Sequence, residues 1–206
     1  MTDSLPRPPG RRALLGLLGL CAGLPAGSGA TGLEAGAAEA GRVPRLRGSL
    51  PDALALDAQG RRRRLVSQVL AGRVVAIDFV LTDCSGFCTA ISAAMAGAQD
   101  LLGHRLGGEV GLLSLALDPL RATPEELAHY AERFEAGPGW DFVALGFQPL
   151  EQALRALGGP EAGSEHAPMV VVLDARRGTL RRVLGLPTPE AILGAVEAAL
   201  AARRTA

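Results

Sequence analysis

The chain has 206 residues, of which 48% are hydrophobic and 3% aromatic, so it can build a core that aliphatic side chains must fill. Lysine plus arginine number 21, as do aspartate plus glutamate, which gives a formal net charge of zero. Proteins that bind nucleic acids normally carry a basic excess, so we expect no nucleic-acid partner.

The first 30 residues have the pattern of a secretory signal. Arg11 and Arg12 belong to a basic start, the apolar stretch Ala13–Leu24 follows, and small residues come next. The apolar stretch is shorter than the roughly 20 residues that span a bilayer. A twin-arginine signal, an uncleaved membrane anchor and lipidation at Cys21 are the alternatives to an ordinary cleaved signal over residues 1–30.

The rest of the chain is predicted to be a linker and one domain. Residues 31–47 are rich in glycine, alanine and glutamate, which favours a flexible linker, and residues 48–206 form the domain. We expect an exported monomer, in the bacterial periplasm or at the outer face of the inner membrane. Cleavage of the signal would leave two cysteines, Cys84 and Cys88, in an oxidising compartment.

The domain is predicted to begin with a β-hairpin, because apolar and polar residues alternate on both sides of Gln59–Gly60. We interpret the run Arg61–Arg64 as a solvated edge strand rather than as a patch for an anionic partner. The stretch Gly72–Leu81 is almost wholly apolar, which is typical of a strand buried on both faces. A helix that ends at Gly103 and a second buried strand over residues 108–118 follow.

The second half of the domain continues to alternate helices and strands. Thr123 is the predicted N-cap of the next helix, and Glu126 is expected to close a capping box. A strand over "DFVAL", a helix over "PLEQALRAL" and a β-hairpin around Gly178 come next. The last helix begins after Thr188, and its predicted apolar face consists of Leu193, Val196, Leu200 and Ala201.

The predicted order is therefore hairpin, β, α, β, α, β, α, β, β, α. The early alternation implies parallel strands joined by crossover helices. The closing hairpin and helix are typical of the C-terminal half of a thioredoxin-like fold. We predict an α/β, thioredoxin-like domain with a central mixed sheet flanked by helices and an N-terminal β-hairpin extension.

Cys84 and Cys88 stand where the first buried strand ends and the next helix begins. Residues four apart share a helix face, so both sulfur atoms can point the same way near a helix N-terminus, which stabilises thiolates. A structural disulfide between them would close a very short loop and would constrain the unfolded chain little. The pair therefore indicates a reactive dithiol or a metal site.

His166 is the candidate for a third donor. His104 follows a helix-ending glycine, so we expect it at the surface, and His129 lies within a capped helix, so we expect it at the surface or partly packed. His166 comes just before the closing hairpin, and in a thioredoxin-like fold the loop there faces the helix that carries the cysteines. Two thiolates and one imidazole suit Cu(I) and also accept Cu(II) or Zn(II).

Other residue types that bind metals or partners have simpler interpretations. We expect core positions for Met95, Met169 and Trp140. Asp83 and Asp118 are either acceptors behind the predicted histidine ligand or charges that face a partner, and Asp118 could equally cap the turn that follows it.

Four stretches of the chain, in family order, resemble the Sco/SenC family of copper-binding, thioredoxin-like proteins. "VVAIDFVLTDCSGFC" resembles the family's strand followed by CxxxC, and "LSLALDPLRATPEELAHYAERF" its strand with Asp-Pro-x-Arg-x-Thr-Pro-Glu. "GWDFVALG" resembles its Trp-containing strand, and "EHAPMVVVLDARRG" its histidine and following strand. Together these stretches extend over most of the predicted domain.

The resemblance implies that copper, as Cu(I) or Cu(II), is bound by Cys84, Cys88 and His166. It further implies a role in the maturation of the binuclear copper centre of cytochrome c oxidase. We expect a metallochaperone rather than an enzyme, with the copper-accepting subunit of the oxidase or another periplasmic cuproprotein as its partner. The alternative is a periplasmic thiol–disulfide oxidoreductase that uses the same cysteines as its catalytic redox pair on a thiol–disulfide partner.

Overall fold

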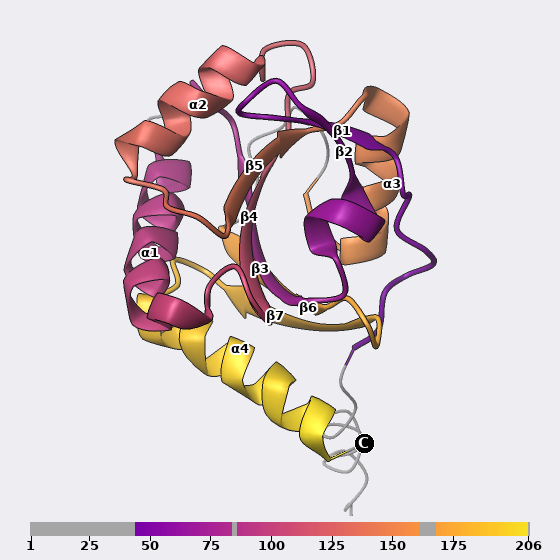
Figure 1. The fold of residues 1–206 in the computed structure, drawn as a ribbon, viewed down its shortest axis with the longest axis vertical. Coiled ribbons are helices and arrows are strands. Elements are labelled where there is room, and N and C mark those ends of the chain that lie inside the picture. The colour runs from indigo at the N-terminus through magenta and orange to yellow at the C-terminus, as the bar shows by residue number, and fades with distance from the viewer. Residues whose placement is uncertain (1–43, 84–85, 161–167, 206) are drawn as a thin grey trace, which may run out of the picture. The chain divides into compact units, whose positions relative to one another are not determined.

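A mixed β-sheet with helices on both faces forms the centre of the structure (Figure 1). The computed structural model describes residues 44–83, 86–160 and 168–205, all within the compact unit Arg42–Ala206. The described strands are β1 (Leu54–Asp57), β2 (Arg62–Arg64), β3 (Val74–Val80), β4 (Val110–Ala116), β5 (Trp140–Ala144), β6 (Met169–Asp174) and β7 (Thr179–Leu184). The described helices are α1 (Phe87–Leu102), α2 (Pro124–Arg133), α3 (Phe147–Leu157) and α4 (Pro189–Arg204), with the short helical segments η1 (Leu65–Leu70) and η2 (Gly103–Arg105).

The sheet has the strand order β2-β1-β5-β4-β3-β6-β7. Strands β3, β4 and β5 are parallel neighbours, whereas β6 runs antiparallel to β3 and β1 runs antiparallel to β5. Every residue of β3 and β4 is buried, as expected of central strands covered on both faces. The C-terminal ends of the three parallel strands therefore lie at one end of the sheet, which we call the carboxyl edge. Strands β1 and β6 begin at the carboxyl edge and β7 ends there, so the predicted mixed sheet with its N-terminal hairpin is confirmed.

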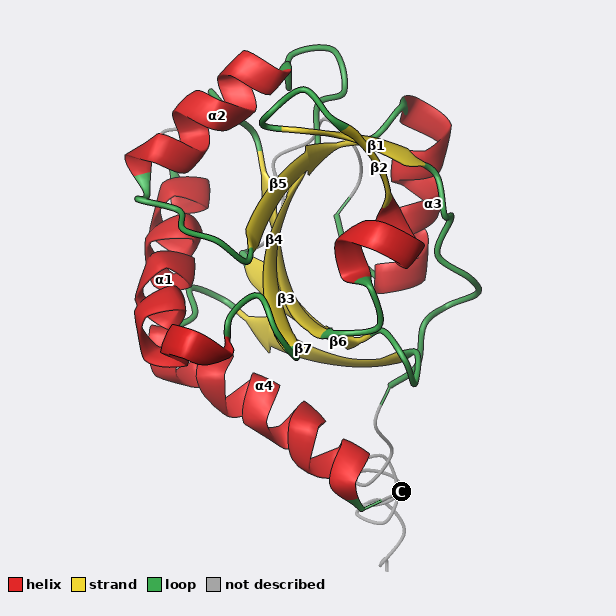
Figure 2. Cartoon of the chain, viewed as in Figure 1, coloured by secondary structure: helices red, strands yellow, loops and turns green. Residues whose placement is uncertain are grey.

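Two layers of apolar side chains pack the helices against the sheet (Figure 2). Helices α1, α2 and α4 cover one face through a layer that includes Met95 and Tyr130. Helix α3 and η1 cover the other face through a layer that includes Phe79 and Leu154. Met95 is fully buried, as predicted, and Met169 is partly buried against the second layer. The loops that leave the sheet at the carboxyl edge therefore start from strands that are packed on both faces.

The N-terminal caps of α2 and α4 are where the sequence predicts them. The hydroxyl oxygens of Thr123 and Thr188 accept hydrogen bonds from the backbone N–H groups of Glu126 and Ala191 at 3.2 and 3.3 Å. The predicted capping box is only half formed, because the N–H of Thr123 donates to the carbonyl oxygen of Arg121 at 2.7 Å. In a complete capping box, the Glu126 carboxylate would accept a hydrogen bond from that N–H instead.

The buried face of α4 differs from the predicted one. Ala201 is exposed, so the prediction was wrong for that position, whereas Leu193 is partly buried and packs against the core. Alanine is so frequent along α4 that the sequence does not clearly separate an apolar face from a polar one. Contact with α1 and the sheet determines which side of the helix is buried. The buried residues of α4 are Ile192, Val196, Ala199 and Leu200.

Residues 44–47, which the sequence analysis placed in the linker, hydrogen-bond to the domain. The N–H of Leu180 donates to the carbonyl oxygen of Pro44 at 2.7 Å, and the N–H of Leu46 donates to that of Gly178 at 2.9 Å. These bonds place the segment beside the start of β7, at the end of the sheet opposite the carboxyl edge. The predicted signal and the linker up to residue 43 lie outside the described residues.

Candidate functional site

Cys88 is the second residue of α1, the helix that follows β3. It is 1% exposed and belongs to the buried face of α1 together with Ile91, Ser92 and Met95. Because α1 starts at the carboxyl edge, Cys88 lies in the first turn, where the positive end of the helix dipole favours a thiolate. The other two predicted ligands, Cys84 and His166, lie outside the described residues.

The described chain on either side of residues 161–167, which include His166, lies next to β3. A Cβ atom placed on Gly159 would lie 2.8 Å from Cζ of Phe79, which is closer than side chains normally approach, so only glycine packs there without a shift. After residue 167 the chain enters β6, which pairs directly with β3. Both flanks therefore adjoin the strand that leads to the cysteines, and the meeting of His166 with them stays a prediction.

A buried group of polar side chains begins one helical turn beyond Cys88. Ser92 Oγ donates to Asp78 Oδ2 at 3.0 Å and lies 3.0 Å from the hydroxyl of Tyr130. Ser114 Oγ donates to Asp78 Oδ1 at 2.6 Å. The same Ser114 oxygen accepts a hydrogen bond from the indole nitrogen of a tryptophan in β5, also at 3.0 Å. These side chains join α1, α2 and three strands, and we call them the Asp78 cluster: Asp78, Ser92, Ser114, Tyr130 and Trp140.

Burial governs the ionisation of the Asp78 cluster. Loss of hydration raises the pKa of Asp78 to about 6, although the hydroxyls of Ser114 and Ser92 stabilise its carboxylate. Burial also raises the pKa of Tyr130, and the nearby charges of Asp78 and Cys88 act in the same direction. Cys88 therefore lies close enough to Tyr130 for its charge to matter, and the cluster forms part of the cysteine's surroundings.

The Asp78 cluster was not predicted from the sequence. Its signal is a single polar residue inside each of two otherwise apolar strands, Asp78 in "VVAIDFV" and Ser114 in "VGLLSLA". Trp140, expected only to pack, is buried and also donates a hydrogen bond. Buried polar groups in native proteins almost always have partners, so such isolated polar residues indicate a shared network.

We expect Asp78 to make folding stability depend on pH. Its folded pKa, about 6, lies above the unfolded value of 3.8. The free energy of unfolding therefore contains a contribution that is complete below about pH 4 and is lost as the pH rises through 6, by about 3 kcal/mol for a shift of this size. Between pH 4.5 and 7.5, urea unfolding should show about 2 kcal/mol of this loss in the wild type and none of it in Asp78→Asn. Equal pH dependence in the two proteins would exclude Asp78 as its source.

At the carboxyl edge, Arg121 connects the loop after β4 to the residue that precedes Cys84. Its guanidinium donates a hydrogen bond to Asp83 and lies 3.8 Å from a carboxylate oxygen of Asp118. Asp118 also accepts a hydrogen bond from the N–H of Leu120 at 3.0 Å, so it caps the turn after β4, one of its predicted roles. These ion pairs are exposed and contribute little to stability, and they lie beside the stretch of chain that leads to the cysteines.

The remaining described histidines are not part of this site. His104 and His129 are both exposed, as predicted. Within residues 44–83, 86–160 and 168–205, no group of three or more His, Cys, Asp or Glu side chains is arranged to hold a metal ion. Two of the three predicted ligands, Cys84 and His166, lie beyond these ranges.

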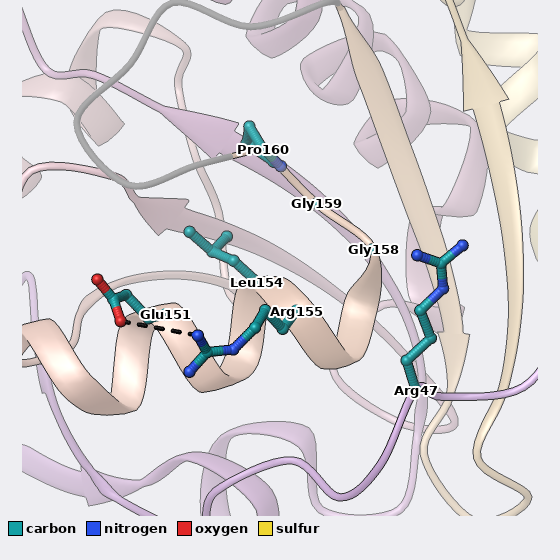
Figure 3. Close-up of a pocket in the computed structure, with 7 residues that line it drawn as sticks. All are labelled: Arg47, Glu151, Leu154, Arg155, Gly158, Gly159 and Pro160. Atoms are coloured by element: carbon teal, nitrogen blue, oxygen red, sulfur yellow. Dashed lines mark ion pairs between the residues drawn. The ribbon is translucent and has the colours of Figure 1, made fainter.

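An open cavity of about 740 Å³ lies beside the C-terminal half of α3 (Figure 3). Arg47 and Arg155 extend along it, and Arg155 pairs with Glu151 at 3.9 Å. Leu154 and residues 158–160 complete the described lining, which offers neither a thiol nor an imidazole. The cavity is thus chemically distinct from the predicted metal site.

Comparisons with known proteins relate this chain to one family. The SCO1/SenC family matches residues 55–138, from β1 to the segment before β5. BsSco, a member of the Sco family of cytochrome c oxidase assembly proteins, has a similar structure, with a TM-score of 0.63 and 20% identity over 77% of this chain and 95% of BsSco. No curated protein sequence matches the chain.

Two further solved structures have the same fold. For Arabidopsis thaliana ScoI with copper bound, the TM-score is 0.59 at 14% identity, over 74% of this chain and 99% of that one. For a SCO1/SenC family lipoprotein from Bacillus anthracis str. Ames, it is 0.57 at 19% identity, over 76% of this chain and 98% of that one. The predicted resemblance to the Sco/SenC family is thus confirmed, by a family match that runs from β1 past α2 and by a shared thioredoxin-like fold.

Proposed function

We propose that this chain is an exported copper metallochaperone that binds one copper ion through Cys84, Cys88 and His166. The observation that carries the proposal is the position of Cys88, in the first turn of α1 at the carboxyl edge, in a fold shared with a copper-bound ScoI. Two thiolates and an imidazole form a soft donor set, which suits copper better than hard cations such as Mg²⁺ or Ca²⁺. The proposed recipient is the subunit of cytochrome c oxidase that carries the binuclear copper centre.

The burial of Cys88 agrees with such a role. Its side chain is covered by protein, so an ion bound to its sulfur would lie in a recess rather than on the outer surface. The two flanks of residues 161–167 adjoin β3, which supports an imidazole that closes over the ion from a separate loop. Three donors leave a coordination position open, through which a ligand of the partner can enter and take the ion by exchange.

We also propose that the protein works outside the cytoplasm, at the outer face of the inner membrane or in the periplasm. The signal-like first 30 residues support this, and so does the relative described as a SCO1/SenC family lipoprotein. No helix in the described part of the chain is long and apolar enough to cross a bilayer. Attachment through the N-terminus and release as a periplasmic monomer are the two forms this proposal allows.

Replacement of His166 by alanine tests the ligand set. We expect the affinity for Cu(I), measured without oxygen by competition with a coloured chelator, to fall about 10- to 100-fold, since the loss of even an outer partner of a metal ligand has effects of that size. His104→Ala and His129→Ala are matched controls, because both imidazoles are exposed, and they should bind copper as the wild type does. Unchanged affinity in His166→Ala would disprove the three-ligand site.

A thiol–disulfide oxidoreductase is the second candidate function. One observation favours it specifically: a disulfide switch was identified in BsSco, which shares this fold. In that case one cysteine attacks the partner's disulfide and the other resolves the mixed disulfide. Reduction of insulin at a rate that survives the loss of His166, together with weak copper binding, would establish this function in place of the first.

A further inference from the structure

Large apolar side chains are exposed mainly at the carboxyl edge. Five of them are 51% to 76% exposed, and each lies at the end of a strand at that edge or shortly after one: Leu54, Leu120, Phe147, Leu184 and Leu186. In the described ranges only one other large apolar residue is exposed, Leu101, near the far end of α1. Exposed apolar surface that is concentrated around one edge indicates a site of interaction with another molecule.

One part of this edge is hollowed into a groove of about 330 Å³. The start of β1, the loop after β4 and the end of β5 form its walls, and we call it the β1 groove. It is lined by Leu54–Leu56, Pro119, Ala122, Ala144–Gly146 and Arg62. Leu120 directly follows Pro119, and Phe147 directly follows Gly146, so both exposed apolar residues are next to the groove lining in the chain.

Arg62 gives the β1 groove a positive charge that no carboxylate among the described residues neutralises. Its neighbours are engaged: Arg61 pairs with Asp57 at 2.9 Å and Arg63 with Asp141 at 2.6 Å. Arg62 is exposed and forms no ion pair or side-chain hydrogen bond with any described residue. Strand β2 is at the edge of the sheet, as predicted, and Arg62 is exposed there, whereas the two arginines next to it are paired with carboxylates.

We propose that the β1 groove docks an apolar side chain and a neighbouring carboxylate of the protein that receives the copper, an inference that rests on the proposed function. Strand β1 lies three strand spacings from β3, which is about 14 Å. A specific interface buries about 800 Å² on each partner, and a circular patch of that area has a radius of about 16 Å. A partner interface of this size that is centred on the end of β3 therefore extends as far as the β1 groove.

The charge of Arg62 distinguishes this occupant from a second copy of the chain. In a twofold dimer across the same edge the same patch is used by both copies, and the described lining of the groove offers no carboxylate to pair with Arg62. A partner with a carboxylate beside its apolar side chain neutralises the charge instead. The groove is therefore more complementary to a partner surface with an apolar side chain and a carboxylate than to a second copy of this chain.

Binding can be tested without copper. The probe is the soluble copper-accepting domain of cytochrome c oxidase from the same organism, titrated in its metal-free form into the isotope-labelled protein. We expect amide shifts in residues 54–56, 62 and 144–147, and about tenfold weaker binding for Leu54→Ser with Phe147→Ser, or for Arg62→Glu, because interface anchors typically contribute more than 1 kcal/mol. Leu101→Ser is the matched control and should bind normally, since Leu101 is exposed at the other end of α1.

Copper transfer separates this inference from the proposed function. The groove variants should keep the wild-type affinity for Cu(I) and deliver it about tenfold more slowly at limiting acceptor, and the Arg62→Glu rate should depend less on salt. Groove variants that bind the domain as tightly as Leu101→Ser would overturn the docking inference alone. So would sedimentation of the wild type as a dimer that Leu54→Ser disrupts. Failure of the wild type to bind copper would instead overturn the proposed function.

Discussion

Replacing Cys88 by serine is expected to weaken Cu(I) binding on the order of a thousandfold or more. The substitution removes a thiolate, the donor that a soft ion prefers, and leaves a hydroxyl that binds Cu(I) poorly. The effect should exceed the 10- to 100-fold loss that removal of an outer partner produces. Cys84→Ser should behave alike, and oxidation of the wild type to a disulfide should release the metal, because both sulfur atoms must be thiolates to bind it. Anaerobic competition with a chelator measures the affinity, and diamide treatment tests the release.

A buried hydroxyl could disturb α1 by itself, so the Cys88 variant needs a matched control. Ala98→Ser introduces the same group at a fully buried position of the same helix without touching a sulfur atom. Thermal unfolding should show similar losses of stability for the two variants, while only Cys88→Ser loses copper. If both variants bind copper equally well, Cys88 is not a ligand.

Replacing Asp174 by alanine is expected to lower the free energy of unfolding by about 3–5 kcal/mol. Asp174 is buried at the end of β6, and the guanidinium of Arg203 in α4 donates to its two carboxylate oxygens at 2.9 and 2.7 Å. Removing one member of a buried ion pair leaves the other charge without compensation. The N–H groups of Arg176 and Arg177, which bond to Asp174 at 3.0 and 3.2 Å, would also lose their acceptor. Urea unfolding at pH 7 measures the loss.

The same pair should respond to acid in the direction opposite to Asp78. Burial would raise the pKa of Asp174, but the bonds from Arg203 and the backbone outweigh it and hold the pKa below its usual value. Its stabilising contribution is therefore present above the unfolded pKa and is lost as the pH falls through the folded one. Glu151→Ala is the control: it removes an exposed ion pair with Arg155 at 3.9 Å and should change stability by less than about 1 kcal/mol. A loss in Asp174→Ala no larger than this would show that the pair does not hold α4 to the sheet.

Local signals were sufficient to predict most of the secondary structure. The apolar run that became β3, the threonine caps of α2 and α4 and the helix-ending Gly103 each depend on residues close in the chain. Strand order is different, because the pairing of β1 with β5 joins segments that are far apart in sequence. No local pattern determines that pairing. The β1 groove depends on it, because residues of both strands line the groove.

In the candidate site, too, features that depend on neighbouring residues were predicted, and features that depend on packing between distant segments were not. Cys88 was found from its spacing and its place after a buried strand, and the structure puts it in the first turn of α1. The Asp78 cluster was not found, because Asp78, Ser92 and Ser114 lie on three different elements and each has a partner only after these pack. A polar residue in an apolar strand signals that such a partner exists but does not identify it.

The contacts of Pro44 and Leu46 with the start of β7 also determine the point at which the upstream chain joins the domain. The chain enters the domain at the pole remote from α1's first turn, so any attachment upstream of Pro44 holds the molecule by that pole. In a membrane-tethered copy, the first turn of α1, which carries Cys88, would therefore lie at the end of the domain that is remote from the tether.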